Sequence, residues 1–394
     1  CILSKKISNS DYVIKVFPDI REIDQSCWDK CAAPEGSTFD PFTSYSFLRA
    51  LEESKSACSE SGWSPCHLGL ESSCGELLGI VPSYLKRHSQ GEYVFDYAWA
   101  DAFERAGGRY YPKLQISIPF TPATGRRLLV SDRVDSKGLE TELAQGLLSL
   151  ADRLKASSVH LTFLEKEQWQ GLSKLGFLQR THSQFHWENR DYRSFSEFLD
   201  SLASKKRKNI KRERKGAIES GVVIERITGK EILERHWDAF YNFYLDTANR
   251  KWGSAYLTRE FFSMVGQTMA EHILLIMCKK GGRYIVGAIN FIGSECLYGR
   301  NWGCVEDYPY LHFEVCYYQA IDFAIENNLK RVEAGAQGAH KLARGYMPTH
   351  TYSSHWIANN SFSEAVSSYL DQERQHVDKE IDFVEKKGPF KDSK

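Results

Sequence analysis

Apolar residues recur along this chain with two periods, one helical and one extended. Between residues 139 and 154 leucines fall on one helical face, at positions 139, 143, 147, 150 and 154, which predicts an amphipathic helix. Short apolar runs over 113–120 and 159–165 predict a strand on either side of it. A helix over 43–54 and a hairpin over 66–88 come earlier. The first half is therefore expected to run helix, hairpin, strand, helix, strand.

The second half repeats this order of elements. We expect a helix over 257–270, a hairpin over 272–293, a strand over 296–303, a helix over 311–328 and a strand over 329–336. The repetition predicts a tandem duplication of one α/β unit, with domains 10–190 and 191–394 and a long C-terminal helix from Ser363. A hairpin followed by a helical crossover gives a mixed sheet with helices on its faces, so the expected fold class is α/β, of the mixed α+β sheet kind.

Charge and cysteine content narrow the functional classes. The 394 residues carry 51 basic and 51 acidic side chains, which argues against attraction of the whole surface to nucleic acid or membrane. No apolar run approaches the length of a membrane span. Ten cysteines are scattered without a CxxC pair, so we expect reduced, mostly buried thiols and a soluble intracellular protein. Because the chain opens at Cys1, we also expect it to be trimmed.

A loop in the first half has the composition of a phosphate cradle. In "PFTPATGRRLLV" the candidate phosphate-binding or cofactor-binding residues are Thr121, Thr124, Gly125, Arg126 and Arg127. Glycine lets a backbone approach a ligand closely, hydroxyls donate hydrogen bonds, and arginine matches phosphate geometry. The alternative is an ordinary Pro/Gly turn with solvated arginines.

The largest local charge lies in "SKKRKNIKRERK", where eight of the eleven residues 205–215 are basic. In a helix, Lys208, Lys211 and Arg212 would share a face, and such crowding is destabilising unless an anion compensates it. We therefore expect these residues to bind a phosphate-bearing partner: coenzyme A, a transfer RNA, a nucleotide-linked substrate or an anionic membrane surface. A merely solvated basic face is the alternative.

The stretch "EAGAQGAHKLARGYMPTHTYSSHW" follows a predicted strand and combines glycines with titratable side chains. Its histidines, at positions 340, 350 and 355, fit no common zinc spacing, so we expect no metal. The glycines predict a tight excursion from which Glu333, His340, Lys341, Arg344 and Tyr346 project towards a ligand. The alternative is a glycine loop with solvent-facing charges.

A second polar stretch lies inside a predicted strand of the same domain. In "YGRNWG", the residues Arg300, Asn301 and Trp302 are unusual for the interior of a sheet. Polar groups there need partners, either a substrate or one another. We therefore count these three as candidate substrate-binding residues.

Five segments together resemble a known family. "SLASKKRKNIKRERK", "RKWGSAYLTREFF", "YGRNWGC", "LHFEVCYYQAIDFAIE" and the stretch from Glu333 to Trp356 are similar to the signature segments of the FemAB-like, Fem-type predicted N-acyltransferases of the GNAT superfamily. The resemblance implies two GNAT-like acyl-CoA N-acyltransferase domains in tandem. It implies an enzyme that moves an acyl or aminoacyl group from acyl-CoA or a charged tRNA onto a small-molecule or peptide amine. Acyl-CoA would be a co-substrate, with no tightly bound cofactor. Plants carry plastid-targeted members, which adds the chloroplast as an expected location after removal of a transit peptide.

Aminolysis of an ester or thioester needs a proton acceptor, a proton donor and stabilisation of the developing oxyanion. We assign Glu333 as the acceptor and His340 or Tyr346 as the donor, and we expect Lys341 and Arg344 to hold phosphate or carboxylate groups. The rival hypothesis is a non-catalytic pseudo-transferase that binds RNA, a lipid headgroup or a protein through its basic helix.

Overall fold

The computed structural model describes residues 12–131, 136–219, 221–251, 255–335 and 338–391. The chain forms two compact units. Unit 1 consists of Cys1–His182 with His350–Asp378, and unit 2 consists of Ser183–Thr349 with Lys379–Lys394. Residues 350–378, which the sequence pattern assigned to the second domain, therefore belong to unit 1. No helix in the described ranges combines the length and the apolar character needed to span a membrane.

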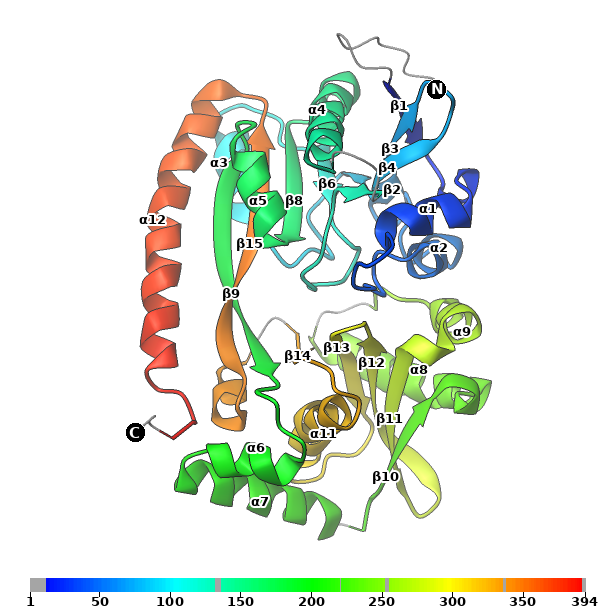
Figure 1. The fold of residues 1–394 in the computed structure, drawn as a ribbon, viewed down its shortest axis with the longest axis vertical. Helices are drawn as coiled ribbons and strands as arrows, with labels where there is room; N and C mark the ends of the chain where they lie inside the picture. Colours follow the sequence, from blue (N-terminus) through cyan, green and yellow to red (C-terminus); the bar gives the residue numbers. More distant parts are fainter. Residues whose placement is uncertain (1–11, 132–135, 220, 252–254, 336–337, 392–394) are drawn as a thin grey trace. The chain divides into compact units, whose positions relative to one another are not determined.

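Unit 1 contains two sheets (Figure 1). The smaller is antiparallel, with the order β1 (Tyr12–Phe17), β3 (His67–Ser72), β4 (Leu77–Val81) and β7 (Leu129–Val130). The larger contains β2 (Trp63–Pro65), β5 (Tyr84–Lys86), β6 (Lys113–Ile116), β8 (Ser158–Leu164) and the last residues of β15 (Met347–Ile357). The helices of this unit are α1 (Gln25–Ala32), α2 (Tyr45–Glu53), α3 (Tyr97–Arg105), α4 (Ser136–Leu154), α5 (Lys166–Ser173) and the first part of α12 (Asn360–Glu385).

The leucines that the sequence places on one face of helix α4 form part of the core of unit 1. Leu139, Leu143, Leu147 and Leu150 are buried, and they share a cluster with residues of β3 and β8 such as Leu68. Each fully buried leucine contributes about 1.5–3 kcal/mol, so this face fixes the helix on the sheet. The helix is the crossover between β6 and β8, which pair in parallel. The predicted helix is confirmed.

Unit 2 is built on one mixed sheet. Strands β10 (Val223–Thr228), β11 (Ile273–Lys280), β12 (Arg283–Ile292) and β13 (Cys296–Cys304) are antiparallel neighbours. Strand β14 (Arg331–Glu333) runs parallel to β13, and the end of β9 (Leu178–Glu188) pairs antiparallel with β14. The helices are α6 (Phe195–Ser201), α7 (Ser204–Glu219), α8 (Glu234–Lys251), α9 (Arg259–Thr268), α10 (Leu311–Phe313), the π-helix η4 (Glu314–Tyr318), α11 (Gln319–Glu326) and the 3-10 helix η5 (Ala339–Arg344). The mixed α/β class expected from the sequence is confirmed.

Helices cover both faces of this sheet. On one face, Gly287 of β12 lies against Phe240 and Phe243 of α8. On the other face, Val286 and Ala288 belong to a core cluster with residues of η4 and α11. Because successive residues of a strand point to opposite faces, the apolar run of β12 is buried on both sides.

The two units repeat one order of strands. In unit 1 a hairpin-like pair, β5 and β6, leads through α4 to the parallel strand β8, which pairs antiparallel with β15. In unit 2 the pair β12 and β13 leads through α10–α11 to the parallel strand β14, which pairs antiparallel with β9. The last strand of each set is exchanged: β9 follows β8 in the chain but pairs with β14, and β15 follows β14 but pairs with β8.

Candidate functional site

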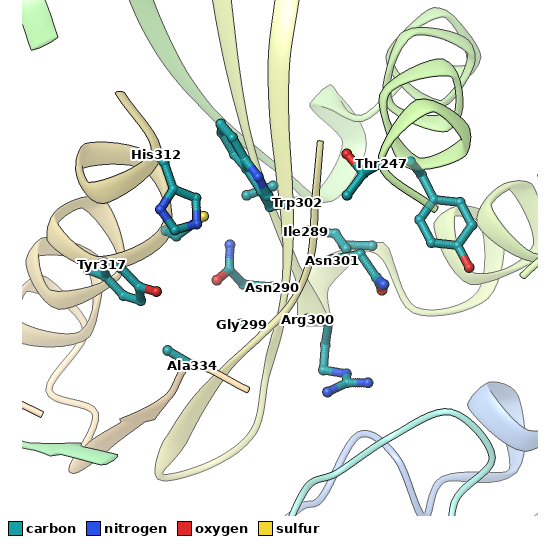
Figure 2. A pocket seen from close by; sticks show the side chains of 13 residues that line it. Thr247, Ile289, Asn290, Gly299, Arg300, Asn301, Trp302, His312, Tyr317 and Ala334 are labelled. Atoms are coloured by element: carbon teal, nitrogen blue, oxygen red, sulfur yellow. The ribbon is translucent and has the colours of Figure 1, made fainter. Parts of the chain in front are cut away.

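A pocket of about 190 Å³ lies in unit 2 where β13 and β14 separate (Figure 2). The parallel pairing covers only Cys296–Tyr298 of β13 and Arg331–Glu333 of β14. The pocket begins at the next residues, Gly299 and Ala334. In mixed and parallel sheets, the carboxyl ends of strands that separate in this way are where ligands bind. The lining residues are Tyr244, Thr247, Ala288, Ile289, Asn290, Gly299, Arg300, Asn301, Trp302, His312, Cys316, Tyr317 and Ala334.

A β-bulge places the polar residues of β13 at this pocket. Ile289 pairs with Asn301 whereas Asn290 pairs with Gly299, so Arg300 is the extra residue of the bulge. A bulge bends the strand and re-aims its side chains. All three residues of β13 that the sequence singled out, Arg300, Asn301 and Trp302, line the pocket.

The opposite wall comes from α10 and η4. His312 contacts Trp302 edge to face, with ring centroids 4.8 Å apart, and lies 5.5 Å from the ring of Tyr317. The Tyr317 hydroxyl is 2.8 Å from Nε2 of His340. Figure 2 shows the side chains of His312 and Tyr317 on one side of the strands and Thr247 on the other. His340, which does not line the pocket itself, thus reaches it through the Tyr317 hydroxyl.

Burial adjusts the protonation of this pair. It raises the pKa of Tyr317 well above the ordinary phenol value, with the charge of Cys316 as a further cause. Burial also lowers the pKa of His340, and the charges of Arg344 and Lys341 lower it further. At neutral pH the pair therefore consists of a neutral phenol and a neutral imidazole, which can pass a proton between them.

Two polar side chains in the pocket are deeply buried. Thr247 of α8 is 5% exposed, and its hydroxyl has no hydrogen-bond partner in the described part of the chain. Asn290 is 2% exposed, and its amide nitrogen donates to the carbonyl of Leu274 at 3.2 Å. An unpaired buried hydroxyl costs about 1–3 kcal/mol. The Thr247 hydroxyl could therefore bond to a polar group of a molecule in this pocket.

Glu333 does not line the pocket. It is 3% exposed, and its carboxylate faces Nε of Arg331 at 3.2 Å and Nε2 of His186 at 3.9 Å. The reason is strand alternation: Ala334, the next residue, lies at the pocket, so the Glu333 side chain points to the other face. The sequence analysis expected the Glu333 carboxylate at the ligand site, but the residue that lines the cavity is its neighbour, Ala334.

Three more residues of the glycine-rich stretch are buried and contact other residues of the protein. Arg344 is buried, makes two 3.0 Å contacts from Nη2 to the Glu213 carboxylate, and stacks 3.4 Å from the centroid of Phe313. Lys341, 1% exposed, donates to the Gly335 carbonyl at 2.7 Å, and burial lowers its pKa to about 8. Tyr346 is buried beside Tyr317. Unlike the residues of β13, none of the three lines the pocket, so they support its wall instead of facing it as expected.

The basic run forms helix α7, which has an attached side and an exposed side. On the attached side, Arg214 pairs with Glu314 at 2.9 Å and with Asp322 at 2.6 Å, while Glu213 accepts Arg344. On the other side, Lys208, Lys211 and Arg212 are exposed, and no ion pair or hydrogen bond joins them to any described residue. Arg214 and Glu213 thus attach the helix to its neighbours, whereas Lys208, Lys211 and Arg212 face solvent.

The loop of the first half is not an open phosphate cradle. Arg127 is fully buried, and its guanidinium donates to the carbonyls of Thr162 at 3.0 Å and Ala123 at 2.7 Å. Arg126 donates to the carbonyl of Ala32 at 2.7 Å. The remaining three candidates are also internal: Thr121 bonds to the Pro119 carbonyl, Gly125 bridges to Leu164, and the buried Thr124 hydroxyl has no partner among the described residues. The predicted cradle is wrong because backbone carbonyls occupy both arginines.

The three histidines of the glycine-rich stretch have three different partners. His340 bonds to Tyr317, His350 lies 2.8 Å from Asp378, and His355 lies 2.7 Å from His160 through their Nδ1 atoms. The three side chains thus lie in separate surroundings. Burial lowers the pKa of His160 to about 3 and that of His355 well below its usual value, so this pair shares one hydrogen between two neutral rings.

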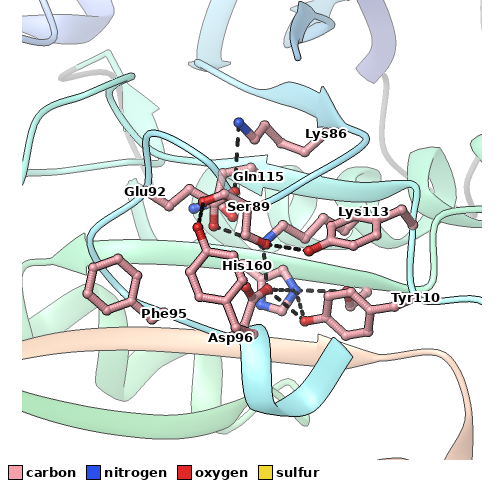
Figure 3. Close-up of polar contacts among 12 residues, drawn as sticks. Lys86, Ser89, Glu92, Phe95, Asp96, Tyr110, Lys113, Gln115 and His160 are labelled. Carbon is pink, nitrogen blue, oxygen red and sulfur yellow. Dashed lines mark hydrogen bonds and ion pairs between the residues drawn. The ribbon is translucent and has the colours of Figure 1, made fainter. Parts of the chain in front are cut away.

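Unit 1 contains a buried ion cluster that the sequence analysis did not find, formed by Lys86, Glu92, Asp96 and Lys113 (Figure 3). Both lysines are 0% exposed. Lys113 donates to Glu92 at 2.8 Å and also pairs with Asp96. Burial lowers the pKa of Lys86 to about 7 and raises that of Glu92. Lys86 ends strand β5, Glu92 and Asp96 lie in the irregular segment that follows, and Lys113 begins β6. The four belong to no motif, so the fold brings their charges together.

Comparison with known proteins identifies the family of this chain. The model of the FemAB-like family, described as peptidoglycan biosynthesis/recognition, matches residues 19–392. The chain belongs to the FemAB-like family. No curated protein sequence matches this FemAB-like chain.

Solved structures show the fold of this FemAB-like protein. The crystal structure of FemX matches with a TM-score of 0.52 at 12% identity, over 90% of this chain and 100% of FemX. L-PGS from Bacillus licheniformis matches with a TM-score of 0.49 at 10% identity, over 85% and 98% of the two chains. A tandem GNAT protein from the clavulanic acid biosynthesis pathway has a TM-score of 0.45 at 10% identity, over 88% and 99%. The likeness to FemX confirms the mixed α/β, GNAT-like fold.

Proposed function

We propose that this FemAB-like protein is an N-acyltransferase that moves an acyl or aminoacyl group from acyl-CoA or a charged tRNA onto an amine, with unit 2 as the reaction site. The observation that carries the proposal is the pocket at the point where β13 and β14 separate. The parallel pairing ends after three residue pairs, so backbone groups of β13 beyond Tyr298 have no hydrogen-bond partner in β14. Such groups can hold an extended donor and an oxyanion.

The residues around the β13 bulge have suitable chemistry for the acyl carbonyl. Arg300 and Asn290 carry side chains that can donate hydrogen bonds, and both line the pocket. Donors fixed in place before the reaction stabilise developing charge without reorganising, and one such donor contributes about 10²–10³ in rate. Trp302 supplies an apolar wall against which the acyl chain or the acceptor can pack.

In this proposal Tyr317 takes the place of Tyr346 as proton donor, and His340, which the sequence analysis already assigned as a donor, acts through the Tyr317 hydroxyl. When Nε2 of His340 carries the hydrogen, it donates to the Tyr317 oxygen and leaves the phenol hydrogen for the departing thiolate or alkoxide. Because His340 is exposed whereas Tyr317 is buried, the imidazole can then replace that proton from solvent. The raised pKa of Tyr317 keeps the phenol protonated and ready to donate.

The donor's phosphates are assigned to α7. Coenzyme A and tRNA both carry phosphate, and α7 presents three exposed cations, Lys208, Lys211 and Arg212, that lack protein partners among the described residues. The same observation favours a second candidate function, a pseudo-transferase that binds RNA, a lipid headgroup or a protein through α7 without catalysis. The two candidate functions differ in whether the pocket catalyses acyl transfer.

The test begins with a thermal-shift screen of acetyl-CoA, longer acyl-CoAs, free CoA and charged tRNA. A ligand at 100 times its Kd stabilises the protein by about 2.7 kcal/mol. With the best donor and a panel of amines, Tyr317→Phe should lower kcat about 10²-fold while leaving the donor Kd unchanged. Tyr369→Phe is the matched control, because Tyr369 lies on the surface of unit 1. Tight binding of a donor without transfer to any amine would favour the binding protein.

A further inference from the structure

A second cavity lies in unit 1, between helices α4 and α5, and has no role in the proposed reaction. Its volume is about 370 Å³, which falls within the range of about 300–1,000 Å³ typical of small-molecule sites. It is lined by Leu128, by residues of the first turns of α4 and by most of α5. All of these residues belong to unit 1, and none of them lines the pocket of unit 2.

The carboxylate of Glu140 is held in place at this cavity. The side-chain amide of Gln168 donates to Oε1 of Glu140 and to the Leu128 carbonyl, both at 2.7 Å. Its oxygen accepts from the backbone N–H groups of Arg127 and Leu128 at 2.8 and 3.3 Å. Gln168 is 4% exposed and uses both donors and both acceptor sites. It therefore fixes one oxygen of Glu140 and leaves the other for a ligand.

Glu140 has no charged partner within the described ranges. It lines the cavity, and no ion pair joins it to a described residue. Burial raises the pKa of Glu140 above its usual value, and the hydrogen bond from Gln168 lowers it by less. A partly buried carboxylate in this state is stabilised by a donor that brings a positive charge. An ammonium group supplies that charge together with three N–H donors.

The cavity carries charges of both signs. Lys137 precedes Glu140 by one turn of α4, whereas Glu167 and Lys174 come from α5 and from the residue that ends it. Lys137, Glu167 and Lys174 are exposed, and none forms an ion pair with a described residue. A ligand of a single sign would meet repulsion as well as attraction here. A ligand with one charge of each sign is attracted at both ends.

The buried part of the cavity is apolar. Leu128 and Leu172 are 2% and 1% exposed and belong to the core of unit 1, and Leu175 packs against that core. A Cβ added to Gly171 would meet no atom within 4 Å, so the space beside this glycine is open. An apolar base below fixed charges matches a ligand with an aliphatic part and charged ends.

We propose that this cavity binds a free α-amino acid with an aliphatic side chain, such as leucine. The ammonium of the ligand donates to Glu140, its carboxylate faces Lys137 and Lys174, and its side chain packs on the apolar base. An amine that is held as an ammonium by a carboxylate is protonated and is not a nucleophile. The cavity is therefore an effector site and not a place where an acceptor amine reacts, and the inference goes beyond the proposed acyl transfer.

The experiment is calorimetric titration of the full-length protein, without an acyl donor, with three related compounds. These are L-leucine, N-acetyl-L-leucine, which lacks the ammonium, and L-leucinamide, which lacks the carboxylate. We expect leucine to bind and each analogue to bind about 10-fold more weakly, because each loses one charge-assisted contact.

Variants assign the two ends of the ligand. Glu140→Gln should weaken leucine binding about 10-fold and leave the binding of N-acetyl-leucine unchanged. Glu142→Gln is the matched control, because Glu142 lies on the same helix but does not line the cavity. Lys137→Gln combined with Lys174→Gln should remove the preference for leucine over leucinamide. Lys166→Gln, at an exposed position of α5 outside the cavity, is the control for that pair.

Gly171 provides a test that does not alter any charge. Gly171→Leu places a side chain in the open space of the cavity and should abolish leucine binding. Replacing a helical glycine by leucine favours the helix, so stability in urea should not fall. Gly171→Ala, with its much smaller side chain, is the control and should still bind leucine. If Glu140→Gln fails to fold, this pair of variants still decides.

The outcomes separate this inference from the proposed function. Absence of leucine binding up to about 10 mM overturns the inference, and so does binding that survives both Glu140→Gln and Gly171→Leu. Equal binding of leucine and N-acetyl-leucine shows an apolar cavity without recognition of the ammonium and also overturns it. None of these results bears on acyl transfer, because no donor is present. Failure to detect acyl transfer would likewise leave leucine binding unchanged.

Discussion

Replacing Lys113 by methionine tests the unit 1 ion cluster. The side chain keeps its length but loses the charge that pairs with Glu92 and Asp96, whose side chains are each only 3% exposed. Lys86 remains 3.8 Å from Glu92 but is not paired with Asp96. Removing one partner of a buried ion pair costs about 3–5 kcal/mol, because the other charge stays buried without compensation.

The pKa of Glu92 determines how the loss of stability in Lys113→Met changes with pH. Burial already raises the pKa of Glu92, with Lys113 opposing the rise. Without Lys113 the Glu92 carboxyl has a folded pKa further above its unfolded value of about 4.3. A raised folded pKa contributes stability below the unfolded pKa and loses it as pH rises through the folded value. The cost of Lys113→Met should therefore be largest near pH 8 and shrink towards pH 5.

Native-state hydrogen exchange and urea unfolding measure this cost. Amides of β6 and β8 in unit 1 should exchange faster in Lys113→Met, whereas amides of β11 and β12 in unit 2 serve as an internal reference. Lys166→Met, at an exposed position of unit 1, is the matched control. Adding Glu92→Gln and Asp96→Asn should recover part of the loss. A loss below about 1 kcal/mol at pH 8, or one that grows towards acid, would refute the reasoning.

Three further outcomes follow. Acid should destabilise unit 1 as pH falls from about 6.5, because burial lowers the pKa of His160 to about 3 and the unfolded chain binds the extra proton. The midpoints of urea unfolding at pH 7.5 and pH 5 test this prediction, and equal midpoints contradict it. Arg344→Met should lower the stability of unit 2 by about 3–5 kcal/mol, with partial recovery in Arg344→Lys, as measured by urea unfolding. Glutamine at Lys208, Lys211 and Arg212 should leave stability unchanged but reduce the slope of log Kd against log salt for tRNA by about 2; an unchanged slope removes these residues from the interface.

Much of the fold was accessible from local patterns. The leucine period predicted α4, and the repeated order of elements predicted the mixed sheet, because both depend on residues that are near one another in sequence. The exchange of β9 and β15 was not accessible. Each strand has the composition of an ordinary strand, and nothing in its period says which distant strand it pairs with.

The candidate site, like the fold, was predicted from the sequence only in part. Arg300, Asn301 and Trp302 were found because polar residues inside a strand are unusual, and the pocket contains them. The Glu333 side chain was placed wrongly because successive residues of a strand point to opposite faces of the sheet, so an error of one residue reverses the face. His312 and Tyr317 were missed because a helical row of aromatic and small residues indicates a core, and the wall of a buried pocket has the same composition as a core.

The exchanged strands have a consequence for how the protein is made. The segment of β15 that pairs with β8 is synthesised after nearly all of unit 2. Unit 1 therefore cannot complete its larger sheet while the ribosome is still translating the second half. Dividing the chain near residue 190 would yield two fragments, each lacking a strand that the other contains. Premature termination between residues 189 and 351 leaves β8 without the segment of β15 that pairs with it, and such an unpaired edge is a site for aggregation.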